Sequence, residues 1–140
     1  MANATVQEVM TPSPSAIESN ENAIEAARMM MAENIGSLPV VNGDELVGMV
    51  TDRDLVLQVM AKDLDPNVVP VSQVCTEDPV VATPDEPLDA ALGRMAAEQV
   101  RRLPVVKGTR LVGILAQADV ARSADSKSTG QLVEKISEES

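Results

Sequence analysis

The feature that most constrains the fold of this chain is an internal duplication. The segment Leu38-Pro39-Val40-Val41 recurs 65 positions later as Leu103-Pro104-Val105-Val106. A sequence repeat predicts two copies of one supersecondary unit, each too small to close its own core, that pack together. Further identical pairs with the same offset, and without a gap, are Val6/Val71, Thr11/Thr76, Ala26/Ala91, Met30/Met95, Leu46-Val47-Gly48/Leu111-Val112-Gly113 and Asp54/Asp119.

Each repeat has the pattern of a mixed α+β unit. In the first repeat, a short strand within 15–18 precedes a helix that ends near Asn34, and two strands and a second helix follow. Ala23, Ala26 and Met30 have the helical spacing of a buried face. The two prolines of the segment 11–14 predict irregular backbone there. We therefore expect two β-α-β-β-α repeats related by a pseudo-twofold, with sheets against each other and helices outside.

The repeats set the expected domain boundaries. Residues 1–62 form the first repeat with its N-terminal segment, 63–70 the linker, and 71–124 the second repeat. Residues 125–140 form a polar tail, in which the apolar spacing of Leu132, Val133 and Ile136 predicts a short helix over Gln131 to Ser137.

Composition restricts the partners. The chain has no Phe, Tyr or Trp, and its formal net charge is −11. Nucleic acid and anionic membranes would be repelled, and aromatic platforms for single strands are missing. The chain also has no His and a single cysteine, Cys75. One cysteine fits a reducing, cytoplasmic environment, and neither a signal peptide nor a membrane-length apolar run is expected.

The junction Leu46–Leu55 has the pattern of a buried strand that runs into a helix start. Free backbone N–H groups at such a junction suit an anion. Thr51 and Asp54 have two interpretations at this stage. They either form a capping box, which stabilises the helix start by roughly 1 kcal/mol, or contact a ligand. At the matching position of the second repeat, Asp119 follows Ala116, which cannot cap.

Together, the duplicated Ala-rich helix, the Leu-Pro-Val-Val strand and the strand-to-helix junction resemble a tandem pair of CBS domains, also called a Bateman module. The resemblance covers about residues 5–123, and with little sequence beyond the pair the chain is similar to stand-alone bacterial CBS-pair proteins of the hypoxic response type. It implies a sensor module, usually without catalysis, that binds AMP, ADP, ATP, S-adenosylmethionine or NAD between the repeats. It also implies a homodimer and an unknown protein effector.

The resemblance also assigns site residues. The ribose aspartate of the family falls on Asp54 and Asp119, with its hydroxyl partner on Thr51 but on Ala116 in the second repeat. The phosphate positions hold Gly36 and Ser37 in one repeat and arginines in the other. The complete set of expected ligand-binding residues is Thr11, Ala16, Thr51, Arg53, Asp54, Thr76, Val81, Arg101, Arg102 and Asp119, with the base side at Thr11, Ala16, Thr76 and Val81.

Other interpretations compete with this one. Arg101 and Arg102 could form a solvated turn, and Asp52 with Asp54 could hold Mg²⁺, mainly as an ion carried by a nucleotide. No metal or cofactor is required. A dimeric interaction scaffold with vestigial clefts is the alternative function, favoured by Ala116. An enzyme is disfavoured, because the chain has no histidine to act as a base for a nucleophile.

Overall fold

The computed structural model describes residues 4–127, which divide into two compact units. We name each after the expected ribose aspartate that it contains. The Asp54 unit comprises 14–80 and 106–111, and the Asp119 unit comprises 4–13, 81–105 and 112–127 within the described range. The expected helix at Gln131–Ser137 lies outside the described residues.

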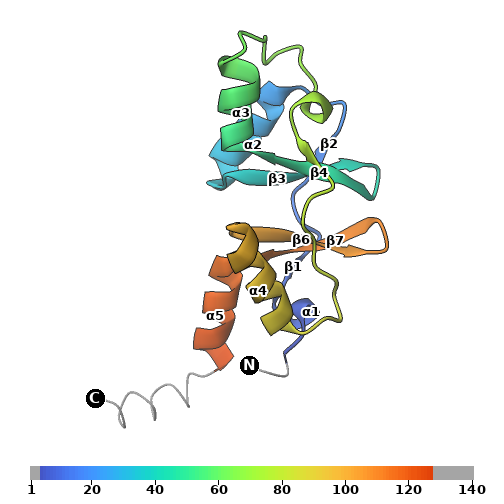
Figure 1. The fold of residues 1–140 in the computed structure, drawn as a ribbon, viewed down its shortest axis with the longest axis vertical. Helices are drawn as coiled ribbons and strands as arrows, with labels where there is room; N and C mark the ends of the chain where they lie inside the picture. The colour runs from blue at the N-terminus through green and yellow to red at the C-terminus, as the bar shows by residue number, and fades with distance from the viewer. Residues whose placement is uncertain (1–3, 128–140) are drawn as a thin grey trace, which may run out of the picture. The chain divides into compact units, whose positions relative to one another are not determined.

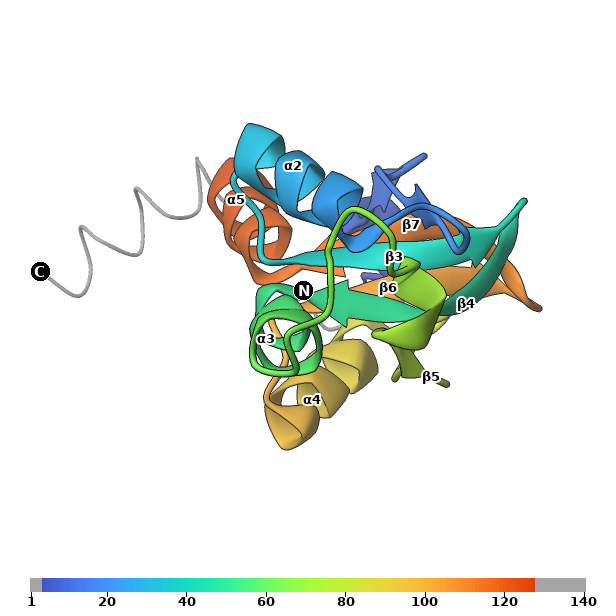
Figure 2. The same ribbon diagram turned by 90° about the horizontal axis from the view of Figure 1, so that it is seen from above.

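In the Asp54 unit, two helices cover one side of a sheet (Figure 1). Seen from above, α2 lies on the β3 side and α3 on the β4 side (Figure 2). β3 and β4 pair as an antiparallel hairpin, β2 joins β3 in parallel, and β5 pairs with β4. The elements are β2 Ile17–Glu18, α2 Ala23–Glu33, β3 Ser37–Asn42, β4 Glu45–Thr51, α3 Asp52–Leu55, the π-helical η1 Val56–Met60, the 3₁₀-helical η2 Val71–Gln73 and β5 Thr76–Glu77.

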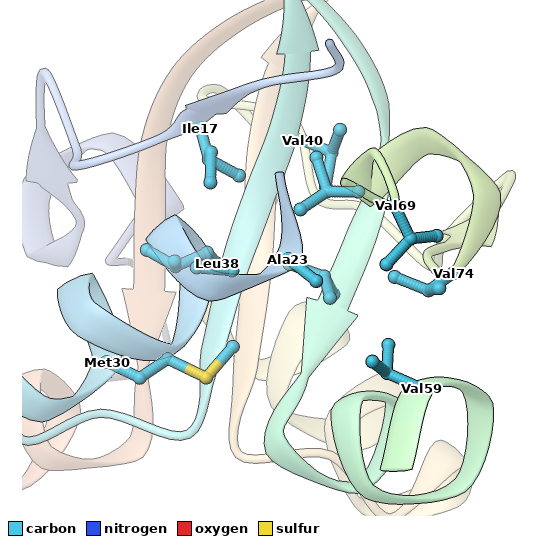
Figure 3. Close-up of a cluster of buried hydrophobic side chains, with 11 residues drawn as sticks. Ile17, Ala23, Met30, Leu38, Val40, Val59, Val69 and Val74 are labelled. Carbon is cyan, nitrogen blue, oxygen red and sulfur yellow. The ribbon is translucent and has the colours of Figure 1, made fainter. Parts of the chain in front are cut away.

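The core of this unit is aliphatic (Figure 3). The helix face expected from the sequence is confirmed, because Ala23, Ala26 and Met30 are buried. They pack with strand residues and with the chain that returns through 69–74. The cluster contains Ile17, Ala23, Ala26, Met30, Leu38, Val40, Val50, Val59, Val69, Val71 and Val74. With no aromatic ring to fill space, close packing of branched side chains supplies the apolar burial.

The Asp119 unit repeats this arrangement, with α4 and α5 on one side of the β6–β7 hairpin (Figure 1). Its elements are α1 Val6–Val9, β1 Thr11–Pro12, α4 Leu88–Glu98, β6 Arg102–Lys107, β7 Arg110–Ala116 and α5 Gln117–Lys127, and the ends of β6 and β7 at 106–111 belong to the other unit. Its core includes Val6, Leu88, Met95, Leu103 and Leu115, all nearly inaccessible. The α+β class expected from the sequence is confirmed.

Each unit takes the opening segment of the other sequence repeat. Thr11 of β1 pairs with Ile114 of β7, and Val6 N–H donates to the carbonyl of Glu86 at 3.1 Å. In the same way, Thr76 of β5 pairs with Met49 of β4. The expectation that 11–14 is irregular was wrong for Thr11 and Pro12. Because β1 pairs with β7 alone, its proline lies on a sheet edge, where a missing N–H is tolerated.

Candidate functional site

The helix start of the Asp54 unit is a capping box. The Thr51 hydroxyl accepts a hydrogen bond from Asp54 N–H at 3.0 Å, and Asp54 Oδ2 accepts one from Thr51 N–H at 2.9 Å. The stabilising interpretation of this pair is therefore confirmed. The side-chain bond of the cap uses Oδ2 and not Oδ1, so the two interpretations do not exclude each other.

The other expected residues of this unit lie on β5, on α3 and beside β2. Thr76 lies on β5, next to Cys75, whose thiol is near enough to Asp54 to be affected by its charge. Arg53 has an exposed side chain and lines a shallow depression with Asp52, Val56 and Leu57. Ala16 immediately precedes β2 and is half-buried.

In the Asp119 unit, both carboxylate oxygens of Asp119 have partners. The Thr11 hydroxyl donates to Asp119 Oδ2 at 3.0 Å, and the Arg122 guanidinium forms an ion pair with Oδ1. The Asp119 side chain is only 11% exposed, whereas that of Arg122 is 72% exposed. Thr11 thus joins the aspartate of the other repeat, which the expected assignment by repeat did not anticipate.

Arg122 is a charged neighbour of the site that the sequence reasoning missed. Its position three residues after Asp119 on a predicted helix was the signal, because residues at this spacing are neighbours on a helix surface. The matching residue of the first repeat is Leu57, so the sequence shows the two helix starts to differ.

The expected phosphate positions lie beside the two helix starts. Gln117 N–H donates to the carbonyl of Arg101 at 2.9 Å, and Asp52 N–H donates to the carbonyl of Gly36 at the same distance. Arg101 is exposed and Arg102 is half-buried at the start of β6. The backbone is therefore equivalent in the two units, but the side chains are not.

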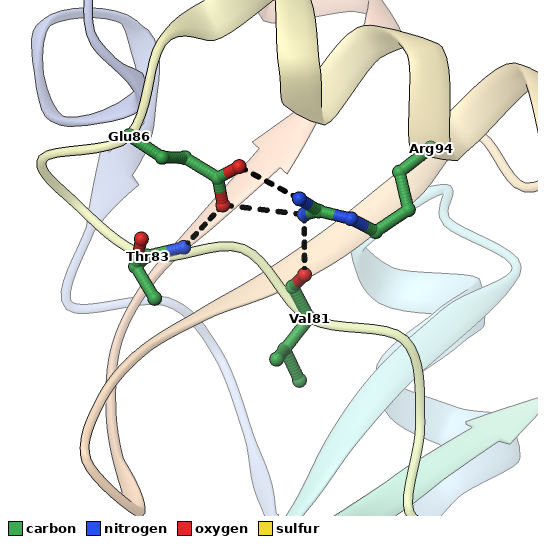
Figure 4. Close-up of polar contacts among 4 residues, drawn as sticks. All are labelled: Val81, Thr83, Glu86 and Arg94. Atoms are coloured by element: carbon green, nitrogen blue, oxygen red, sulfur yellow. Dashed lines mark hydrogen bonds and ion pairs between the residues drawn. The ribbon is translucent and has the colours of Figure 1, made fainter.

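A polar network holds the expected base-side residue Val81 (Figure 4). Arg94 of α4 donates to the Val81 carbonyl at 2.7 Å and pairs with Glu86, whose carboxylate also accepts from Thr83 N–H. The hydrogen bond from Arg94 holds the pKa of Glu86 below its ordinary value. The first repeat has Met29 in place of Arg94, so this network belongs to the second repeat's sequence alone.

The described residues offer little to metal or thiol chemistry. Burial, with the nearby charge of Glu77, raises the pKa of the Cys75 thiol, which disfavours the reactive thiolate. The side chains that the structure describes include no group of three Cys, Asp or Glu placed to hold a metal ion, and the sequence has no histidine. None of the helices within residues 4–127 is both long and apolar enough to span a membrane.

Comparison with known proteins gives a consistent result. The family model described as the CBS domain matches residues 6–61 and 71–126. The chain is 37% identical to the CBS domain-containing protein YhcV of Bacillus subtilis, over 96% of both chains. It is 33% identical to hypoxic response protein 1 of Mycobacterium tuberculosis, over 94% of this chain and 93% of the relative.

Three solved structures illustrate the similarity of this chain's fold to those of known proteins. Hypoxic response protein I with two coordinated zinc ions has a TM-score of 0.78 at 34% identity, covering 85% of this chain and 98% of the other. The AMP complex of CBSX2 has 0.75 at 29%, covering 86% and 95%. The CBS pair of MJ0100, in complex with 5′-methylthioadenosine and S-adenosylmethionine, has 0.71 at 28%, covering 89% and 98%.

Proposed function

The chain belongs to the CBS-domain family as a pair of CBS domains, and from this premise we propose that it is a non-enzymatic, cytoplasmic sensor of an adenosine-containing ligand. The observation that carries the proposal is the aspartate that recurs at the same position of α3 and α5, each beside a polar helix start. Similar proteins that bind AMP, 5′-methylthioadenosine and S-adenosylmethionine support this ligand class. ADP, ATP and NAD belong to the same class.

The chemistry of the two aspartates suits a ribose. A carboxylate accepts two parallel hydrogen bonds, which matches the two neighbouring hydroxyls of the sugar. Asp54 would do this beside the Thr51 hydroxyl, whereas Asp119 has Ala116 in that place and is supported by Thr11. Ligand entry at Asp119 would release Arg122, whose exposed guanidinium could then turn to a phosphate.

The remaining expected residues take complementary roles. Ala16 and Thr76 in one unit, and Thr11 and Val81 in the other, would contact the base. A phosphate would be held by arginines, which bind its oxygens in a fork geometry. The arginines are Arg101 and Arg102 in the Asp119 unit. In the Asp54 unit, Arg53 lies in the first turn of α3, where the 5′ end of the ligand would lie. A magnesium ion would enter only as part of a metal–nucleotide complex.

Calorimetric titration tests the proposal. Wild-type protein is titrated with adenosine, AMP, ATP and S-adenosylmethionine, together with Asp54→Asn and Asp119→Asn, which keep side-chain volume. Asp44→Asn, in the exposed turn between β3 and β4, is the matched control for loss of one charge. We expect each site variant to lose one binding event and the control to lose none. Absence of binding to wild type below millimolar concentrations would refute the sensor function.

An exposed apolar face supports association with a second copy of the chain. This η1 face consists of Val56, Leu57, Met60 and Leu64, which are between 41% and 70% exposed. Asp52 and Lys62 lie near its two ends and carry opposite charges. An antiparallel pairing about a twofold axis would place each Asp52 end beside a Lys62 end, which favours a closed homodimer.

The alternative function is a dimeric scaffold that binds no nucleotide. Ala116, which lacks the hydroxyl, and the occupied carboxylate of Asp119 favour it. The scaffold predicts the same dimer with no heat of nucleotide binding.

The sensor function has one further requirement. The ligand must bind more tightly to one conformation than to another, so that binding changes the populations of the two conformations and an effector protein can respond to the change.

A further inference from the structure

We infer that the two units accept adenosine ligands of different charge, and that Asp52 sets the difference. The Asp54 unit takes a derivative that is uncharged or cationic at the 5′ position, whereas the Asp119 unit takes a 5′-phosphate. This inference rests on the proposed function, and its test separates the failure of one from the failure of the other.

The first observation is the position of the Asp52 carboxylate. A Cβ atom placed on Gly36 would lie 3.0 Å from Asp52 Oδ2. The carboxylate therefore occupies the space into which a side chain at position 36 would begin to extend. Two backbone contacts hold it there, since Asp52 N–H donates to the Gly36 carbonyl at 2.9 Å and Asp52 Oδ1 accepts from Arg53 N–H at 2.8 Å.

The same place in the Asp119 unit has the opposite character. Arg101 stands at the position of Gly36, and the uncharged Gln117 stands at the position of Asp52. The backbone hydrogen bond from Gln117 N–H to the Arg101 carbonyl preserves the geometry of its counterpart. On an equivalent backbone, the second repeat thus has an arginine where the first has glycine, and an uncharged glutamine where the first has the carboxylate.

The charges around each helix start reinforce this contrast. Asp52 and Asp54 outnumber Arg53 in one unit. In the other unit, Arg101 and Arg122 outnumber Asp119. A phosphate that approaches the ribose aspartate would meet net negative charge in the first case and net positive charge in the second. A sulfonium or an uncharged 5′ substituent would avoid that repulsion in the Asp54 unit.

The expected effect is measurable. Two unit charges several ångströms apart near a wetted protein surface interact strongly enough to change a dissociation constant about tenfold. Because 1.4 kcal/mol corresponds to a tenfold change in affinity, removal of the Asp52 charge should tighten AMP binding on the order of tenfold. The gain should shrink as salt is raised, since the site is open to solvent.

Each site is tested alone in the full-length chain. Asp119→Asn leaves the Asp54 unit as the intact site, and Asp54→Asn leaves the Asp119 unit. Each variant is titrated with AMP and with 5′-methylthioadenosine, an uncharged probe. The titrations are repeated after addition of Asp52→Asn, which preserves the shape of the side chain. Asp44→Asn, in a turn of the same unit, controls for the change in net charge.

We expect the Asp119→Asn protein to bind 5′-methylthioadenosine about ten times more tightly than AMP, and Asp52→Asn to abolish that preference by improving AMP alone. The Asp54→Asn protein should prefer AMP and be insensitive to Asp52→Asn. Equal affinity of the Asp54 unit for both probes, or an Asp44→Asn effect as large as that of Asp52→Asn, overturns the inference while the sensor function stands. Binding of neither probe to wild type overturns both.

Discussion

Replacement of Gly48 by alanine should destabilise the Asp54 unit by forcing two chain segments apart. Gly48 lies in β4, where β5 crosses it closely. An added Cβ would lie 2.4 Å from the carbonyl oxygen of Thr76 and 3.1 Å from Cys75 Sγ. The nearer atom belongs to the backbone, so no side-chain rotation relieves the clash. The β4–β5 pair at Met49 and Thr76 must separate or shift.

The magnitude follows from the size of that clash. Overpacking of this kind costs typically about 1–3 kcal/mol, and a weakened backbone hydrogen bond adds about 1 kcal/mol. Alanine offsets part of this by about 0.5–1 kcal/mol, because glycine loses more backbone entropy on folding. The net loss is about 1–3 kcal/mol, which lowers the melting temperature by roughly 4–12 °C for a chain of this size.

The assay is thermal and urea unfolding followed by far-ultraviolet circular dichroism, since the chain has no tryptophan or tyrosine. Gly93→Ala is the matched control. Gly93 lies within α4 with no atom within 4 Å of an added Cβ, so alanine should stabilise by about 1 kcal/mol. Gly113→Ala should destabilise less than Gly48→Ala, because its nearest contact is the flexible Met10 side chain. A Gly48→Ala protein as stable as wild type would refute the close crossing.

Two further predictions concern acid stability and association. The lowered pKa of Glu86 means that its contribution to stability is present above its ordinary value of 4.5 and is lost as pH falls below 4.5 through the lowered pKa. Glu86→Gln should therefore flatten the decline of unfolding free energy in that range, and parallel curves for the two proteins would contradict the Arg94–Glu86 pair. Met60→Asp should convert the proposed homodimer to a monomer in sedimentation equilibrium at micromolar concentration, because a buried unpaired carboxylate is costly. Val68→Asp, at an equally exposed site outside η1, should remain dimeric, and a dimeric Met60→Asp protein would exclude the η1 face.

Local patterns in the sequence were sufficient for the main helices, the two strand hairpins and one of the two helix starts. Helical spacing placed Ala23, Ala26 and Met30 on the buried face of α2, as observed. The Thr51–Asp54 spacing predicted the capping box, since its hydrogen bonds join residues three apart. Both signals depend on residues three to seven positions apart. The chain connectivity and the geometry of a helix start or a helical turn already determine how such residues lie relative to one another.

Long-range contacts were beyond the reach of such patterns. The approach of Thr11 to Asp119 joins residues 108 positions apart and belongs to opposite repeats. A sequence repeat suggests that the first segment of each copy packs within that copy. The residues of β1 do not indicate which of the two hairpins β1 joins. Local patterns also did not identify the segments that approach Gly48 and Gly113 most closely, which are residues 75–76 and 10–11.

The sequence by itself therefore determined the duplication, the α+β class, the two aspartates and the absence of histidine and aromatic chemistry, because these depend on residue identity and short spacing. The tertiary structure alone decided that the units exchange their opening segments, that Thr11 of one repeat holds Asp119 of the other, and that the Asp52 carboxylate lies against Gly36. These outcomes depend on which apolar faces are buried against each other. Such burial involves residues that are far apart in the sequence, so it is determined only when the whole chain folds.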